Sequence, residues 1–242
     1  MDLESGVVMD RFRQVFSTPH VVLPIVHVTN HDQAGRNVQI ARDAGTNGAF
    51  LISHGSVADA ELFDIYLRIA EENAGFWLGV NCLGWGSEEF FTRARDRVAG
   101  VWIDDALIDE SRPEQPTAAR FLEVQQSVGW RGLYFGGVAF KYQRPVRNLA
   151  NASRNAVPFM DVVTTSGPGT GKAAAPEKIR TIRQAIGDKP LAIASGVTPE
   201  NVPDYLPWAD CFLVATGISY TFDELDPDRV RDLVQVVRSW PN

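Results

Sequence analysis

Eight short apolar runs recur along the chain, and each is followed by polar residues and then by a helical pattern. The runs show little alternation of polar and apolar residues, which is typical of parallel strands covered by helices. They span residues 21–28, 48–54, 76–83, 100–105, 132–138, 160–166, 190–196 and 211–217. Eight strand–helix units without a linker predict an α/β fold, a single (β/α)8 TIM-barrel domain over residues 1–242. The alternative, a doubly wound open sheet, needs fewer strands and a clear switch point.

The intervals between the runs carry signals of helices and of their ends. Residues 59–75 place their apolar side chains on one stripe. After the seventh run, Thr198 fits a helix N-cap and Pro199 the first helical position. Residues 1–20 predict a short N-terminal helix that closes the bottom of the barrel, and residues 140–159 predict a long loop with a helix. Five glycines fall where helices should end: Gly45, Gly75, Gly100, Gly129 and Gly187.

Composition excludes several classes of function. The net charge of −7 and the lack of a basic cluster argue against a nucleic-acid partner. Cys82 and Cys211 lie inside apolar runs, so we expect buried thiols rather than a disulfide or a zinc site. The N-terminal residues do not resemble a signal peptide, and no apolar run is long enough to span a membrane. We expect a cytoplasmic protein without a membrane partner or a cofactor. The sequence leaves a homo-oligomer open.

The stretch TTSGPGTGKAAAP, residues 164–176, resembles the phosphate-binding loop of nucleotide hydrolases. That loop requires GxxxxGK followed by Ser or Thr. Here Ser166 occupies the first glycine position and Ala173 follows Lys172, while Pro176 places the helix start after the lysine. We therefore expect no nucleotide site. In a barrel this segment follows strand six at the active-site end, so it predicts a substrate loop of Ser166, Gly167, Thr170, Gly171 and Lys172. A solvated surface loop is the alternative.

The ends of the last two strands predict a phosphate site. Barrels often bind phosphate with the loops after strands seven and eight. The sequences ASGVTPENV and VATGIS place Gly196, Val197, Thr216 and Gly217 at those ends, and a helix is expected to begin at ISYTFDEL. Backbone N–H groups at the four residues can converge on an anion, and the glycines allow close approach. The alternative is that both glycines serve only as turn residues.

Three of these segments together, SGPGTGKAAAPEKI, ASGVTPENV and ADCFLVATGIS, resemble the BtpA/SgcQ family of barrel proteins. Shorter stretches agree at LPIVHV, LGVN and GVAFKYQRPV, so the resemblance runs from about residue 20 to about residue 220. It implies the barrel scaffold. It implies little chemistry, because the family is linked to photosystem biogenesis and to sugar operons without an agreed reaction. The phosphate end also resembles that of phosphoribosylanthranilate isomerase, a ribulose-phosphate-binding barrel, at the level of the fold alone.

The chain departs from the family pattern at three positions. The Pro–Gly-rich stretch after the first strand is replaced by VTNHDQAGRN. The Glu–Asn pair after strand two becomes Ser53–His54, and the Lys–His pair after strand five becomes Lys141–Tyr142. These differences indicate a divergent member, for which the resemblance implies the scaffold and not the substrate.

Ionisable and polar residues at strand ends are the candidates for catalysis: Asn81, Asp104, Asp105, His54 and Lys141. Because side chains alternate along a strand, one of Asp104 and Asp105 should face the mouth and serve as a general base. Asn81 fits a hydrogen bond to a substrate oxygen. Lys141 suits anion binding, or nucleophilic attack if it is desolvated. Each also has a structural interpretation, as a helix cap, a satisfied amide or an exposed lysine.

Three histidines should lie near one another, because the strands that carry them are adjacent: His27 lies in the first strand, His31 just beyond it, and His54 ends the second. The HxH spacing of a metal site is absent, so His54 is better interpreted as an acid or base, and no metal is expected. The leading hypothesis is a barrel enzyme that acts on a small phosphorylated metabolite by acid/base isomerase or lyase chemistry. The alternative is a non-catalytic ligand-binding or assembly protein on the same scaffold.

Overall fold

Eight parallel strands close into a barrel in the order of the chain in the computed structural model, which describes residues 10–241. The strands are β1 (Val21–His27), β2 (Gly48–Ile52), β3 (Trp77–Asn81), β4 (Gly100–Ile103), β5 (Leu133–Gly137), β6 (Val162–Ser166), β7 (Leu191–Ala194) and β8 (Cys211–Val214). Strand β1 pairs with β8 through Val21 and Cys211, which closes the ring. The predicted barrel is confirmed, and the open sheet is excluded.

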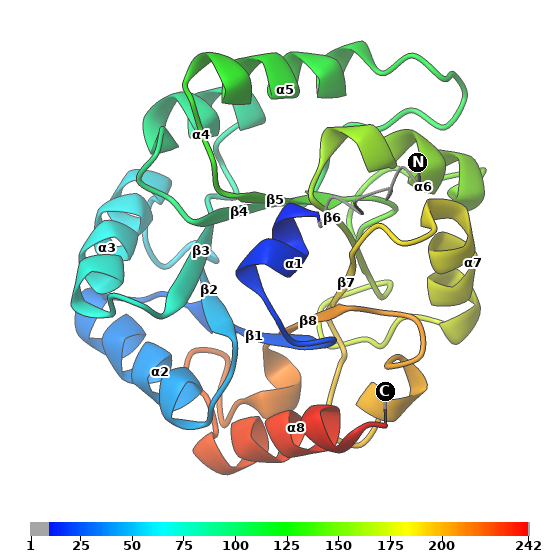
Figure 1. Ribbon diagram of the computed structural model, residues 1–242. Coiled ribbons are helices and arrows are strands. Elements are labelled where there is room, and N and C mark those ends of the chain that lie inside the picture. Colours follow the sequence, from blue (N-terminus) through cyan, green and yellow to red (C-terminus); the bar gives the residue numbers. More distant parts are fainter. Residues whose placement is uncertain (1–9, 242) are drawn as a thin grey trace, which may run out of the picture.

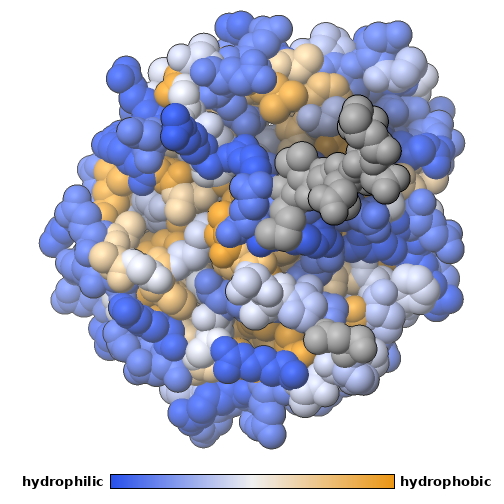
Figure 2. All heavy atoms as spheres, viewed as in Figure 1, coloured by the Kyte–Doolittle hydropathy of each residue, from blue (hydrophilic) through white to orange (hydrophobic). Residues whose placement is uncertain are grey.

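Helices surround the strands (Figure 1). The α-helices of this ring are α2 (His31–Asp43), α3 (Asp59–Glu72), α4 (Ser87–Ala94), α5 (Pro116–Ser127), α6 (Leu149–Ala156), α7 (Pro176–Ile186) and α8 (Pro227–Ser239). Short 3-10 helices η1 (Val157–Phe159), η2 (Val202–Asp204) and η3 (Thr216–Ile218) complete the elements. Hydrophilic side chains cover much of the outer helices on the face in view, and hydrophobic ones appear between them (Figure 2).

Two of the expected helix signals were wrong. The segment after β7 forms only the 3-10 helix η2, although the Thr198 hydroxyl accepts from the amides of Glu200 and Asn201 as a cap does. Pro203 and Pro207 lack amide donors, so an α-helix cannot continue through them. Four of the five glycines lie after helices with positive φ, but Gly100 begins β4, where a Cβ would meet the Trp77 ring at 2.3 Å.

On each strand every second residue, that is, the residues of one parity, points its side chain into the barrel interior and fills it. Phe50, Trp102 and Phe135 meet there edge to face, with ring centroids 5.1–6.0 Å apart for the pairs that include Phe50. Residues of the opposite parity, such as Val101 and Tyr134, pack under the helices. This parity decides which residues at the strand ends point into the mouth.

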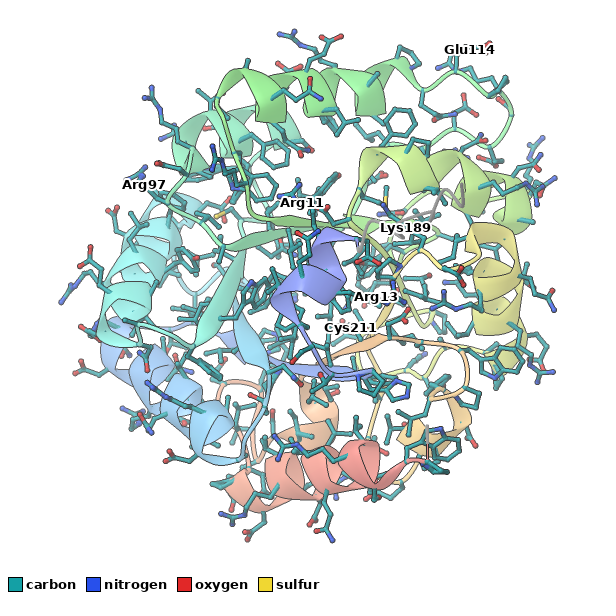
Figure 3. The ribbon with its side chains drawn as sticks, viewed as in Figure 1. Arg11, Arg13, Arg97, Glu114, Lys189 and Cys211 are labelled. Carbon is teal, nitrogen blue, oxygen red and sulfur yellow. The ribbon has the colours of Figure 1, made fainter. Side chains whose placement is uncertain are left out.

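Helix α1 (Arg11–Val15) lies across the N-terminal end of the barrel, at the centre of the ring of strands (Figure 1). Phe12 and Phe16 insert into the interior core and are almost fully buried. Arg11 and Arg13 extend from the helix near Lys189 and Cys211 (Figure 3). Arg13 pairs with Asp210 at 3.2 Å. The predicted N-terminal helix is confirmed for these residues, and residues 1–9 lie outside the described chain.

Candidate active site

A cavity of about 220 Å³ opens at the C-terminal end of the barrel, opposite α1. All eight strands or the loops that follow them contribute to its wall; loop 1 to loop 8 denote the segments after β1 to β8. Apolar side chains of the interior form the floor: Ile25, Ile52, Trp102, Ala194 and Leu213. The polar wall comes from His27, His54, Asp104, Lys141, Tyr142, Thr170, Ser195 and Thr216. Polar groups above an apolar floor are the usual composition of a small-molecule site.

Asp104 follows β4 and has the inward parity of Trp102, so its carboxylate faces the cavity. Asn81, the last residue of β3, is buried and donates from Nδ2 to Asp104 Oδ1 at 3.0 Å. Burial raises the pKa of Asp104, and the hydrogen bond from Asn81 opposes that rise. Asp105 is exposed outside this cavity and accepts from the Leu107 amide at 2.8 Å. The two neighbouring carboxylates therefore have different environments, and Asp104 is the one at the mouth.

Lys141 lies in loop 5, four residues after the end of β5, and its side chain lines the cavity. Its Nζ donates to Ser195 Oγ at 2.9 Å and to Thr170 Oγ1 at 3.4 Å. Its backbone amide donates to Ser166 Oγ at 2.8 Å, which fixes the start of the loop. Burial lowers the pKa of the Lys141 ammonium, and the nearby Asp104 opposes this shift. Across residues 10–241 neither Lys141 nor Asp104 forms an ion pair, so each is held by neutral groups.

Two of the three candidate histidines lie together at the cavity, and the third lies elsewhere. His27 and His54 lie together with ring centroids 5.4 Å apart, and the Phe222 ring stacks on His27 at 3.9 Å. Burial lowers the pKa of His27, whose Nδ1 lies 2.7 Å from the Phe222 carbonyl oxygen. His31 starts α2 instead and contacts Glu72 at 3.0 Å, so the expected grouping of all three histidines was wrong. In residues 10–241 no group of three His, Cys, Asp or Glu side chains is arranged to hold a metal.

Loops 6, 7 and 8 pack backbone to backbone at glycines. A Cβ on Gly196 would lie 2.2 Å from the Ala173 nitrogen, and Gly196 also has a positive φ of 69°. A Cβ on Gly217 would lie 2.0 Å from the Val197 carbonyl oxygen. Both glycines therefore permit one loop to approach the next, which differs from the expectation that they leave room for a ligand.

The predicted phosphate-binding segment contains several amides without an acceptor, and Thr216 is the one of its four residues that lines the cavity. Gly196 and Val197 are buried, and their N–H groups have no hydrogen-bond acceptor within the described chain. Thr216 and Gly217 begin η3, and the first amides of a helix have no acceptor inside it. The longer helix expected from residue 218 was wrong: loop 8 turns back through a Ser219–Leu225 bridge, and α8 begins at Pro227.

Loop 6 is placed as the sequence predicted, at the mouth and before a helix that starts at Pro176. Thr170 and Gly171 line the cavity, whereas the Lys172 side chain is exposed outside it. Gly167 allows the loop to fold back, because a Cβ there would lie 1.9 Å from the Lys172 carbonyl oxygen. Ser166 is the last residue of β6 and is buried, so it is not part of the loop. Its hydroxyl oxygen accepts a hydrogen bond from the Lys141 backbone amide.

Two residues of this region were missed from the sequence. Ser195 accepts from Lys141 and has a positive φ of 75°, which a serine rarely adopts and which no sequence signal marks. Lys178 is half-buried and donates from Nζ to the carbonyls of Ala139 and Ser166, both at 2.6 Å; burial lowers its pKa to about 8. A lysine in the first turn of a helix opposes the helix dipole, and that is the signal that could have singled it out.

These features define a (β/α)8-barrel protein with a small, partly polar cavity at its C-terminal mouth. More particularly, the chain belongs to the BtpA family, whose family model matches residues 75–239. No curated protein matches the sequence. Within residues 10–241, none of the helices combines the length and the apolar character needed to cross a membrane.

Solved structures share the fold at low sequence identity. Phosphoribosyl anthranilate isomerase from Thermus thermophilus is 14% identical with a TM-score of 0.65, over 90% of this chain and 98% of that one. The (S)-3-O-geranylgeranylglyceryl phosphate synthase of Thermoplasma acidophilum, in complex with sn-glycerol-1-phosphate, is 11% identical with a TM-score of 0.69, over 96% and 100%. Tryptophan synthase alpha chain from Legionella pneumophila is 12% identical with a TM-score of 0.66, over 95% and 98%.

Proposed function

We propose that this chain is an enzyme that acts on a small phosphorylated metabolite, a sugar phosphate or a phosphoribosyl compound, by acid/base isomerase or lyase chemistry. One observation carries the proposal: a carboxyl group and an amine, Asp104 and Lys141, share a small cavity without ion-pair partners and lie beside loops with unpaired amides. The similar barrels named for phosphoribosyl and glycerol phosphate compounds support the same class of ligand.

Each residue has a role in this proposal. Asp104 moves the proton, because a carboxyl group whose pKa is raised by burial is closer to the range in which general acids and bases work. Asn81 orients the carboxylate, and His54, which lines the same cavity, is a second acid or base. Lys141 holds an oxygen anion of the substrate, or attacks a carbonyl carbon in its neutral form, which its lowered pKa favours.

The phosphate group would bind on the other side of the cavity. The amides of Gly196, Val197, Thr216 and Gly217 supply its donors, and Thr170 and Gly171 of loop 6 cover it from above. Hydrogen bonds to a charged group are worth about 1.5–3 kcal/mol each, so a phosphorylated ligand should bind far more tightly than its dephosphorylated form. Such binding depends on the backbone, so Thr216→Ser should have little effect.

A thermal-shift screen of phosphorylated metabolites, each paired with its dephosphorylated form, tests the proposal. A hit should raise the melting temperature only when phosphorylated, and solvent deuterium should enter it in the presence of the enzyme. Asp104→Asn should keep binding and abolish the exchange, whereas the control Asp64→Asn, on the exposed face of α3 and outside both cavities of the mouth, should keep both. Equal affinity with and without the phosphate would refute the proposal.

A non-catalytic binding or assembly protein is the second candidate, because large side chains are exposed around the mouth. Tyr142 is 79% exposed and Tyr220 is 67% exposed, which suits a partner surface. Ligand binding without any exchange or turnover, equal in wild type and Asp104→Asn, would favour this function.

A further inference from the structure

Exposed apolar side chains gather at the mouth of the barrel. In residues 10–241 the large hydrophobic side chains that are well exposed are Val15, Leu83, Leu107, Tyr142, Tyr220 and Phe222. All but Val15 belong to loops at the C-terminal end. Water makes such exposure costly, and its concentration at one end marks a surface that binds something apolar.

Leu107 is the least expected of these side chains. It is 51% exposed and has a positive φ of 54°, a conformation that is strained for leucine. The Asp105 carboxylate holds the strained turn by accepting from the Leu107 amide. An apolar side chain kept exposed in a strained turn suggests a functional constraint on that position.

Leu107 and Leu83 line a second cavity, of about 550 Å³, between loops 3 and 4. Its other walls include Trp85, Ile103 and Phe121. Four acidic residues line it: Glu88 pairs with Arg120 and Glu89 with Arg93, whereas Asp104 and Asp105 have no ion-pair partner within residues 10–241, so the groove disfavours an anionic group. The groove is therefore suited to an uncharged, apolar group.

The groove continues the mouth cavity, because Asp104 and Leu83 line both. At about 220 Å³ the mouth cavity alone is smaller than the roughly 300–1,000 Å³ of typical ligand sites. In a closed barrel of eight strands in chain order, loops 3 and 4 lie across the mouth from loops 7 and 8. A ligand with its phosphate on loops 7 and 8 would therefore pass over Asp104 and extend into the groove.

We infer that the ligand of this barrel has two unlike ends, a phosphate group on loops 6 to 8 and an apolar group, ring-sized or larger, in the groove between Leu83 and Leu107. The inference rests on the proposed phosphate site. It adds that the reacting carbon or nitrogen lies between the two ends, over Asp104 and Lys141. Small sugar phosphates without an apolar group would then fill only half of the site.

The test compares inorganic phosphate, methyl phosphate, phenyl phosphate and n-hexyl phosphate by isothermal titration calorimetry. Burying a ring or a chain of this size should raise the affinity over methyl phosphate by about tenfold or more. A preference for phenyl over hexyl phosphate would identify an aromatic group, and the reverse a hydrocarbon chain. Equal affinity of methyl, phenyl and hexyl phosphate would overturn the inference while leaving the phosphate site intact.

Leu107→Asn is the decisive variant, because asparagine tolerates a positive φ and should fold at least as stably. It should remove the preference for phenyl and hexyl phosphate and leave methyl phosphate binding unchanged. The matched control is Val15→Asn, which alters a 48% exposed side chain at the other end of the barrel and should change nothing. If Leu107→Asn keeps the preference for phenyl and hexyl phosphate, as Val15→Asn should, the apolar group binds elsewhere and the inference fails.

A ligand without phosphate separates the two proposals. Benzyl alcohol should shift the indole N–H resonance of Trp85, assigned with Trp85→Phe, even if no phosphate ester binds. A shift of the Trp85 resonance by benzyl alcohol, together with no binding of any phosphate ester, would refute the phosphate site and retain the apolar groove. A change of oligomeric state in Leu107→Asn, with no response to any ester or to benzyl alcohol, would instead show that the surface contacts another protein chain and would overturn the inference.

Discussion

Gly217→Ala tests the packing of loops 7 and 8, on which the proposed phosphate site depends. The added Cβ would lie 2.0 Å from the Val197 carbonyl oxygen, and real Cβ contacts begin near 3.0 Å, so the loops must separate by about 1 Å. Overpacking of this kind costs about 1–3 kcal/mol, and the loss of glycine's freedom in the unfolded chain offsets about 0.4–1 kcal/mol. We expect a net loss of about 1–2 kcal/mol.

For a chain of this length, that loss lowers the melting temperature by about 2–8 °C. Urea unfolding followed by circular dichroism gives the free energy, and calorimetry with inorganic phosphate gives the affinity. Phosphate binding should weaken as well, because the amides of Val197 and Gly217 would no longer meet at one point. The larger Gly217→Val should have the same effects in stronger form.

Gly35→Ala is the matched control. Gly35 lies inside α2, and a Cβ there would meet only Ile69 Cδ1 at an ordinary 3.5 Å. Alanine favours a helix interior by about 0.5–1 kcal/mol over glycine, so this variant should be more stable and bind phosphate normally. If Gly217→Ala is as stable as wild type and binds phosphate equally well, the packing argument is wrong.

Three further variants test other contacts. Asp104→Asn should raise the free energy of unfolding at neutral pH, because the raised pKa of Asp104 means that its charged form is disfavoured in the folded state. This gain in stability should vanish as the pH falls below 3.8, the ordinary pKa of an aspartate, and urea unfolding at a series of pH values measures it. Glu110→Gln should lower the free energy of unfolding by about 1.5–3 kcal/mol at pH 7, since Arg144 holds the pKa of Glu110 at about 2. In the same assay this loss should shrink as the pH falls from 4.5 toward 2. Phe12→Ala should cost about 3–5 kcal/mol in chemical denaturation at neutral pH, because it empties the bottom of the barrel.

The strands were predictable because burial on both faces leaves a continuous apolar signal that does not depend on distant contacts. The position of Asp104 followed in principle from parity, since it is two residues beyond the inward Trp102. The sequence alone left Asp104 and Asp105 equivalent, because the register of a strand within a barrel depends on its neighbours.

The parts that could not be predicted depend on contacts between loops. The turn of loop 8 that brings Phe222 onto His27 arises from tertiary packing, and the sequence pattern there is also compatible with a helix. Ser195 belongs to the site because its hydroxyl accepts a hydrogen bond from Lys141 Nζ, and its backbone there has a positive φ that the sequence does not signal. The groove of Leu83 and Leu107 was likewise unmarked, since single exposed leucines in a sequence look like any other loop residue.

The helix across the bottom of the barrel has a consequence for the order in which the chain assembles. Arg11 and Arg13 donate to Arg131, Gly132, Asp188 and Asp210, partners that are 120 to 197 residues away in sequence. The ribosome makes α1 before all of these partners: Arg131 and Gly132 come just before β5, and Asp188 and Asp210 come before β7 and β8. The contacts of α1 therefore become available in turn: Phe16 meets Trp77 of β3, and Phe12 meets Phe135 of β5. The contact of Arg13 with Asp210 can form only when β8, the strand that closes the barrel, begins to emerge, so docking of α1 can be completed only together with closure of the ring.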